Sequence, residues 1–359
     1  MTLRVALVGG PVYDHLYSLL DGLDVEVIVH TDHPSLNRKV AAMLSAGERI
    51  DLLATHSKYA PSQKQWLHQL DGRLDTSRLA PLAMRMCRTD DTLYCVPRLI
   101  DVRIMWVRTD RMPRVPTTWA EIAKGRVVFG FPGRESGLFG TFFELVVGAG
   151  GQLFTDDGLP CMESPEAEYA IEMLCRLASR APADLQTWHY DQVDRALLDG
   201  RIDAAGVWPG GWGAIRDHSL VNRFTPHPYP AGPSRWVSYA GCHAWAIPTT
   251  CGDLPGAMNL LRLLTSAEAN ALDAQGGNVC ANLDAFAALE PVNDTDRQRM
   301  AITVATIESA MITYPQHPRF PEVEDAGWQS INDAIRAMRS PRSAAREMQR
   351  RAQAVLGAI

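Results

Sequence analysis

The chain has 359 residues, of which 46% are hydrophobic and 21% are charged, as is ordinary for a soluble globular protein. Its length exceeds what one hydrophobic core usually supports, so two lobes are expected. The formal net charge of −6 offers no basic surface, which argues against nucleic acid and anionic membranes as partners. No apolar run approaches the roughly 18 residues that span a bilayer.

The first sixty residues alternate between strand and helix patterns. The expected strands cover residues 3–8, 25–29 and 50–54, and the expected helices lie around 17–20 and 38–46. This alternation predicts an open, largely parallel sheet, in which ligands gather at the loops after the carboxyl ends of strands. The loops at 9–13 and 55–59 are of this kind, and the contacts predicted in them are Tyr13, His56, Ser57 and Tyr59.

The rest of the chain gives weaker but ordered signals. Thr118 is a good N-cap for a helix that begins at Trp119. The expected strands are 127–131, 204–208 and 237–247; the expected helices are 142–147, 167–179 and 190–198, and most of the last sixty residues. A glycine-rich loop, 132–140, lies between the expected strand 127–131 and the expected helix 142–147. No internal repeat or low-complexity linker separates two halves, so the chain is expected to cross between its lobes more than once.

Six segments, in order, resemble the solute-binding proteins of ABC transporters, in particular the carbohydrate-binding group related to maltose-binding protein. They are the strand and loop of 51–60, the stretch 97–110, the helix start PTTWAEI at 116–122, GGQLF at 150–154, the stretch 194–210 and the helix start at 263–269. Each motif is weak alone, but their order over about residues 50–285 is what carries the resemblance.

The resemblance implies an α/β, two-lobe periplasmic binding protein fold of type II, with a mostly parallel sheet flanked by helices in each lobe. The N-terminal lobe is expected to hold residues 1–108 and 242–305, and the C-terminal lobe residues 109–241 and 306–359. It further implies a monomer that captures a sugar or sugar derivative in the cleft between the lobes by hinge closure. The expected partner is the membrane permease of an ABC transporter, and no cofactor is expected.

Candidate ligand contacts follow from polar and aromatic residues near the expected lobe crossings and strand ends. Asp101 and Arg103 alternate on an extended run and so share one face, either as ligand contacts or as a structural ion pair. A helix start after a glycine-rich loop presents backbone N–H groups to a polar ligand, which favours Arg134, Glu135 and Ser136. Trp208 and Trp212 flank a Pro-Gly-Gly turn as candidate platforms for sugar rings, or as core residues. Gly241 and His243 fall near the return crossing.

The alternative is an enzyme on the same fold, similar to the pyrimidine-forming enzymes of thiamine biosynthesis. No dinucleotide fingerprint, HExxH motif or recognisable catalytic triad supports it. Cys242 and His243 are adjacent on an expected strand and therefore point to opposite faces, which argues against a nucleophile–base pair. The seven cysteines show no CxxC spacing, so neither a disulfide framework nor a metal site is expected. We therefore predict no catalytic and no metal-binding residues.

The sequence is compatible with two cellular locations. The resemblance implies the periplasm, whereas the first residues carry an apolar run of only about five residues, shorter than a secretory signal requires. A native start at Met1 would place the protein in the cytoplasm.

Overall fold

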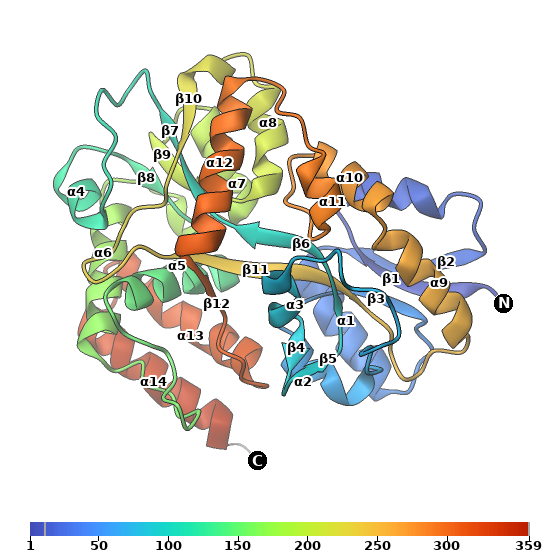
Figure 1. The fold of residues 1–359 in the computed structure, drawn as a ribbon. Helices are drawn as coiled ribbons and strands as arrows, with labels where there is room; N and C mark the ends of the chain where they lie inside the picture. Colours follow the sequence, from blue (N-terminus) through green and yellow to red (C-terminus); the bar gives the residue numbers. More distant parts are fainter. Residues whose placement is uncertain (11, 358–359) are drawn as a thin grey trace. The chain divides into compact units, whose positions relative to one another are not determined.

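The computed structural model describes residues 1–10 and 12–357, and it divides into two compact units (Figure 1). Unit 1 comprises Met1–Asp101 and Gly241–Glu290, and unit 2 comprises Val102–Ala240 and Pro291–Ile359. The chain therefore crosses between the units three times, as expected for lobes without a simple linker.

Two of these crossings differ from the boundaries predicted from the sequence. The first falls after Asp101 instead of residue 108, because strand β7 (Ile104–Arg108) pairs with strands of unit 2. The third falls after Glu290 instead of residue 305, because helix α12 (Asp294–Ser309) contacts the same sheet of unit 2. The second, after Ala240, lies within one residue of the predicted position.

Unit 1 is built on a sheet of buried strands. Its strands are β1 (Leu3–Val8), β2 (Val25–Thr31), β3 (Leu52–His56), β6 (Val96–Val102) and the second half of β11 (Ser238–Ala246), with a small hairpin of β4 (Arg88–Thr89) and β5 (Thr92–Leu93). Strand β1 pairs in parallel with β2 and β3, as the βαβ alternation predicts. Strand β11 runs antiparallel to β3 and also pairs with β6.

The helices of unit 1 follow from local capping and packing signals. They are η1 (Asp14–Leu20), α1 (His33–Ser45), α2 (Ala60–Gln63), η2 (Lys64–Trp66), α3 (Pro81–Met86), α9 (Leu254–Leu264), α10 (Ala267–Gln275) and α11 (Leu283–Ala287). In α1 the Asp32 side chain accepts the Ser35 N–H, and Leu36, Val40 and Leu44 form the buried stripe. This helix packs on β1 and β2.

Unit 2 contains a four-stranded sheet in the order β10-β7-β9-β8, among the residues that the structure describes. Its new strands are β8 (Phe129–Gly130), β9 (Ala204–Val207) and β10 (Phe224–His227), while β12 (Met311–Thr313) pairs in parallel with the start of β11. Strand β7 is antiparallel to both of its neighbours, and only the β8–β9 pairing is parallel. The sheet of unit 2 is therefore mixed, whereas the sequence predicted a mostly parallel one.

Helices surround this sheet. They are α4 (Trp119–Lys124), α5 (Glu135–Gly148), α6 (Pro165–Ala178), η3 (Leu185–Thr187), α7 (Tyr190–Leu198), η4 (Pro209–Gly211), α8 (Trp212–Arg216), η5 (Val221–Arg223), α13 (Phe320–Ile335) and α14 (Pro341–Gly357). The predicted cap of α4 is confirmed as a capping box of Thr118 and Glu121. Helices α5, α6, α13 and α14 pack on one another, and α5 is buried along nearly its whole length.

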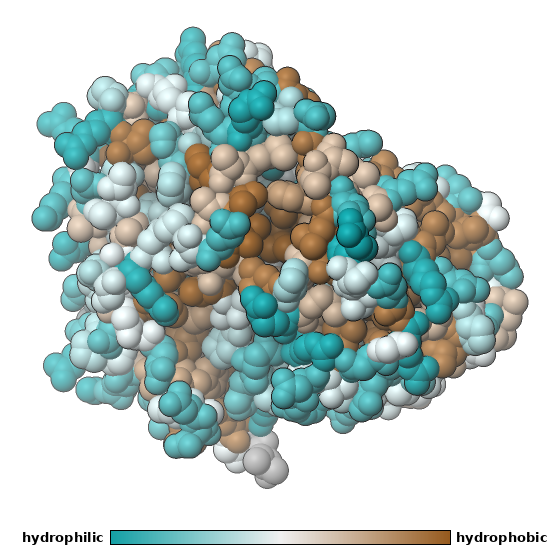
Figure 2. All heavy atoms as spheres, viewed as in Figure 1, coloured by the Kyte–Doolittle hydropathy of each residue, from teal (hydrophilic) through white to brown (hydrophobic). Residues whose placement is uncertain are grey.

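The surface and the helix lengths carry two further observations. Figure 2 shows a face in which hydrophilic side chains alternate with smaller apolar areas, a common pattern for globular proteins. Within residues 1–10 and 12–357, every helix is too short or too polar to cross a bilayer.

Candidate functional site

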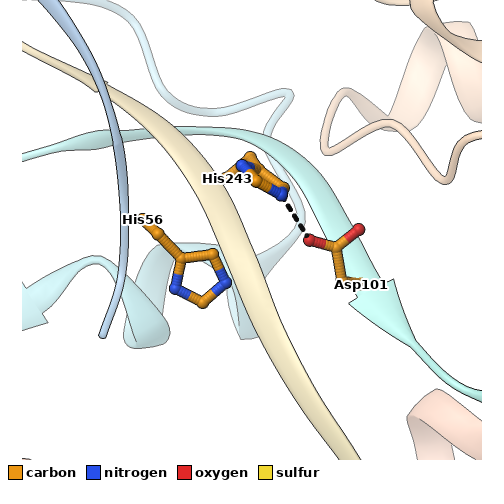
Figure 3. A group of neighbouring side chains, drawn as sticks. All are labelled: His56, Asp101 and His243. Atoms are coloured by element: carbon orange, nitrogen blue, oxygen red, sulfur yellow. Dashed lines mark ion pairs between the residues drawn. The ribbon is translucent and has the colours of Figure 1, made fainter. Parts of the chain in front are cut away.

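Unit 1 gathers polar side chains on three neighbouring strands. His56 is the last residue of β3, His243 lies in β11 and Asp101 lies in β6. His243 pairs directly with His56 in the antiparallel ladder, and β6 is the other neighbour of β11. Residues opposite each other in such a ladder carry their side chains on the same face. The three side chains therefore come together, although they are far apart in the sequence (Figure 3).

His243 is the centre of this group. Its Nε2 lies 3.0 Å from Asp101 Oδ2 and 2.9 Å from the Tyr13 hydroxyl. Its ring also lies 5.1 Å from the ring of His56 and 5.0 Å from that of His33. His33 in turn stacks on Tyr59 at 5.4 Å. We call these six residues, Tyr13, His33, His56, Tyr59, Asp101 and His243, the histidine face.

Burial sets the charge of this face. Burial, with the nearby charges of His243 and Lys58, holds the pKa of His33 well below its ordinary value. Burial and the same neighbours also hold the pKa of His56 well below its ordinary value. Both rings are thus neutral near pH 7. His56 Nδ1 accepts the Lys58 N–H, so this ring offers its Nε2–H as a donor to a polar ligand.

The loop that carries Tyr13 is held by a buried ion pair. Arg98 donates two hydrogen bonds to Asp273, of 2.6 and 2.7 Å, and a third of 3.1 Å to the carbonyl of Tyr13. The guanidinium also lies over the rings of Tyr17 and Trp245. Arg98 is almost fully buried, so it positions Tyr13 and leaves no group for an anionic ligand.

Unit 2 gathers a different set of side chains at the starts of two helices. Glu135 begins α5 and its Oε2 lies 3.3 Å from Nε2 of His189, the N-cap residue of α7. Arg134 Nη1 lies 3.6 Å from the other oxygen of Glu135. Tyr190 follows His189 and contacts the half-buried Trp208 at the end of β9, with ring centroids 6.1 Å apart. We call these residues the aromatic face.

Glu135 has a strained backbone. Its φ is 54°, in the left-handed region that costs a residue with a Cβ about 1–2 kcal/mol. Such outliers cluster at ligand sites, where the surrounding structure holds them in place. Ser136 follows in the first turn of α5, where backbone N–H groups face outward.

The structure separates two residues that the sequence paired. Asp101 lies in unit 1 and bonds to His243, whereas Arg103 lies in unit 2, where it pairs with Glu144 and donates to Thr141 Oγ1 at 3.2 Å. Burial alone would lower the pKa of Arg103, but the Glu144 carboxylate raises it above its ordinary value. Arg103 is enclosed by this pair and by the rings of Trp208, Tyr229 and Tyr239, so it belongs to the core of unit 2.

Three further predicted contacts have structural roles. Trp212 is buried and stacks on Trp106, with ring centroids 5.5 Å apart, so the structure places it in the core and not on the aromatic face. Ser57 Oγ accepts the Cys242 N–H at 3.2 Å and so ties the loop after β3 to β11. Gly241 is buried within β11.

The sequence analysis missed three residues of these two faces, and also Asp194 in helix α7. His33 follows β2, whose exit was not considered beside those of β1 and β3. His189 and Tyr190 lie at the start of a predicted helix, whereas the sequence prediction used only the helix start at 135. Asp194 lies one turn further in α7, where burial and then Asp191 raise its pKa to about 7. The sequence signal that could have identified these residues is their location just after an expected strand or near the start of an expected helix.

The comparisons with known proteins agree with this architecture. The family model of the bacterial extracellular solute-binding proteins matches residues 22–271. Three solved structures superpose on nearly the whole chain, each with 98% or more of both chains covered. They are the maltose-bound MalE3 of T. maritima (17% identity, TM-score 0.86), a solute-binding protein of Thermotoga lettingae TMO bound with α-D-tagatose (18%, 0.84) and one of Agrobacterium radiobacter K84 in complex with ribitol (17%, 0.86).

Proposed function

The chain belongs to the bacterial extracellular solute-binding protein family, and from this premise we propose that it binds a sugar or polyol and delivers it to the permease of an ABC transporter. The similar structures named above hold maltose, tagatose and ribitol, which are all small polyhydroxylated molecules. We further propose that the protein is monomeric and works outside the cytoplasm.

The observation that carries the proposal is that unit 2 presents a half-buried aromatic ring, Trp208, and a carboxylate, Glu135, which contact the adjacent residues Tyr190 and His189. Trp208 is only half-buried and has Tyr190 beside it, and Glu135 stands in a strained conformation at the nearby helix start of α5. A sugar presents C–H groups on its ring faces and hydroxyl groups at its edges, so an indole face and a carboxylate oxygen suit the two parts.

The histidine face of unit 1 suits the same class of ligand. Neutral imidazoles, two phenols and one carboxylate provide donors and acceptors in mixed order, which hydroxyl groups can match in either role. Two predicted contacts, Tyr13 and His243, already share one hydrogen bond. We propose that Tyr13, His56, Tyr59, Asp101 and His243 contact the ligand from unit 1, and that Arg134, Glu135, Ser136 and Trp208 do so from unit 2.

Binding without turnover is part of the proposal. Cys242 and His243 do not form a nucleophile–base pair, because the Cys242 thiol lies 3.8 Å from that of Cys87 in the core while the His243 ring contacts Tyr13 and Asp101. The opposite directions of the two side chains are those that a strand imposes.

Thermal unfolding against a panel of monosaccharides, disaccharides and polyols tests the proposal. A ligand at 100 times its Kd should stabilise the folded protein by about 2.7 kcal/mol and shift Tm accordingly. Ligand analysis after incubation should show no conversion. If no compound shifts Tm and a compound is consumed, the enzyme alternative replaces this proposal. Closure of the units on the ligand stays a prediction, which small-angle X-ray scattering with and without ligand tests.

A further inference from the structure

We propose that His56, Asp101 and His243 together bind one divalent transition-metal ion, with Zn²⁺ as the ion best suited to them (Figure 3). The sequence had predicted no metal site, because none of its cysteines or histidines show ligand spacing. The site appears only when three strands are brought side by side. It goes beyond the proposed solute binding and does not depend on it.

The donor atoms lie close enough to share an ion. Each residue offers one ligand atom, and these atoms all lie within 4.8 Å of one another. Two of them, His243 Nε2 and Asp101 Oδ2, are 3.0 Å apart. Two ligands of a tetrahedral zinc ion, with bonds of about 2.0–2.1 Å, lie roughly 3.3 Å apart. His243 and Asp101 are thus near this spacing already, and the His56 donor lies within 4.8 Å of both.

The donor types select the metal class. Two imidazole nitrogens and one carboxylate oxygen suit zinc and its neighbours in the first transition row. Calcium and magnesium prefer oxygen ligands alone, and one carboxylate does not provide enough of them. Three protein ligands leave at least one coordination position open for water or for a ligand oxygen.

The protein holds the His56 ring in place through the nitrogen that would not bind the ion. His56 Nδ1 accepts the Lys58 N–H at 3.1 Å, and the other nitrogen of the ring is on the side that faces Asp101 and His243 in Figure 3. An ion at Nε2 therefore moves the ring proton to Nδ1 and costs this one neutral hydrogen bond. The strands themselves supply the rigidity that positions a metal site.

A second observation points to a missing partner in this cluster. His243 Nδ1 and His33 Nε2 are buried and have no hydrogen-bond partner among the described residues. Buried polar atoms are nearly always satisfied, and an exception calls for an ion, a water or a ligand. His243 is nine-tenths buried and also belongs to the ion-binding trio. The unsatisfied His33 Nε2, on a ring 5.0 Å from that of His243, favours a further occupant beside the three donors, while His243 Nδ1 faces away from an ion bound at Nε2 and is left for a water or a ligand.

Zinc titration of the full chain, without any sugar present, tests the inference. The unaltered protein, first freed of metal with a chelator, should bind one Zn²⁺ per chain in a saturable manner by isothermal titration calorimetry. Cobalt loading should give the visible d–d bands of a site with nitrogen ligands. His56→Ala, Asp101→Asn and His243→Ala should each weaken the affinity by at least about tenfold.

The chain contains a matched control on the same unit. His30 Nε2 lies 2.7 Å from Asp14 Oδ1 in an exposed pair that has no third ligand among residues 1–10 and 12–357, so His30→Ala and Asp14→Asn should leave the zinc affinity unchanged. If the unaltered chain shows no saturable binding, or if the three site variants bind as tightly as the two controls, the inference is wrong. Should the site variants fail to fold, X-ray absorption of the zinc-loaded unaltered chain decides, because a shell without two imidazoles overturns the proposal.

Discussion

The two faces of this protein position their polar side chains by different kinds of secondary structure. The histidine face is placed by strands, where the direct pairing of His243 with His56 fixes which side chains meet. The aromatic face is placed by helix starts and a strand exit, and it includes a residue with a strained backbone, Glu135. The comparison teaches that strands can assemble a dense polar cluster, while helix ends provide separate groups around an aromatic ring. Substitutions in one face or in the residues that support it test this comparison.

The largest expected effect is on the support of the histidine face. Arg98→Ala removes the main partner of a buried, doubly hydrogen-bonded ion pair and leaves Asp273 with His15 alone beside it. The free energy of unfolding should fall by about 3–5 kcal/mol, measured by urea denaturation. Arg78→Ala breaks the exposed pair with Asp284 and should cost under about 1 kcal/mol. Equal losses in the two variants would show that Arg98 has no special structural role.

The next effect depends on pH and concerns the helix beneath the aromatic face. Burial and Asp191 raise the pKa of Asp194 to about 7, from 3.8 in the unfolded chain. The folded state therefore keeps a proton that the unfolded state has already lost, and stability falls as pH rises from about 4 to 7. Asp194→Asn should remove this loss and stabilise the protein at pH 8 by about 2 kcal/mol, with no gain at pH 4.

Stability curves of the two proteins at pH 4, 6 and 8 check this prediction. The difference should grow between pH 4 and 7 and then stay constant. Asp191→Asn removes only the second cause of the raised pKa, so it should reduce the pH dependence in part and leave the larger effect of burial. A difference that is already present at pH 4 would mean that Asp194 acts by packing and not by its charge.

Much of the fold can be predicted from local sequence signals, such as hydrophobic patterns and helix caps. The pattern of residues 3–54 predicts β1, β2 and β3, and Thr118 predicts the start of α4. The mixed sheet of unit 2 could not be predicted in this way, because the direction of β7 depends on strands about a hundred residues later. Alternation along one strand placed Asp101 and Arg103 on a shared face, yet the change of unit between them separates their partners.

The candidate site shows the same limit. His56 and His243 were each predicted singly, from positions at or near strand ends, but their direct pairing depends on a register that no local pattern contains. Trp208 and Trp212 look alike in the sequence, on either side of one turn. Only packing distinguishes them, since Trp212 stacks on Trp106 in the core and Trp208 keeps part of its ring exposed.

That distinction gives the third prediction, which concerns affinity. Trp208→Ala should weaken binding of the solute found in the thermal screen by about tenfold or more, or roughly 1.4 kcal/mol, because the aromatic surface for a sugar ring is lost. Calorimetric titration measures it. Trp212→Phe should lower Tm through lost core packing while the affinity of the folded protein stays within about twofold. The reverse pattern would place the ligand away from the aromatic face.

The smallest effect is expected at Glu135, where strain and recognition oppose each other. Glycine tolerates a φ of 54° without a Cβ penalty, so Glu135→Gly should stabilise the folded protein by up to about 1 kcal/mol. The same change removes the carboxylate beside His189 and should weaken solute binding. Glu135→Gln keeps the backbone strain and one hydrogen-bonding oxygen but removes the negative charge. It should therefore lower the affinity for the solute without raising the stability of the folded protein. If glycine gains stability and keeps full affinity, the strain at Glu135 serves no recognition; if it loses affinity as stability rises, the strained residue is retained for the ligand.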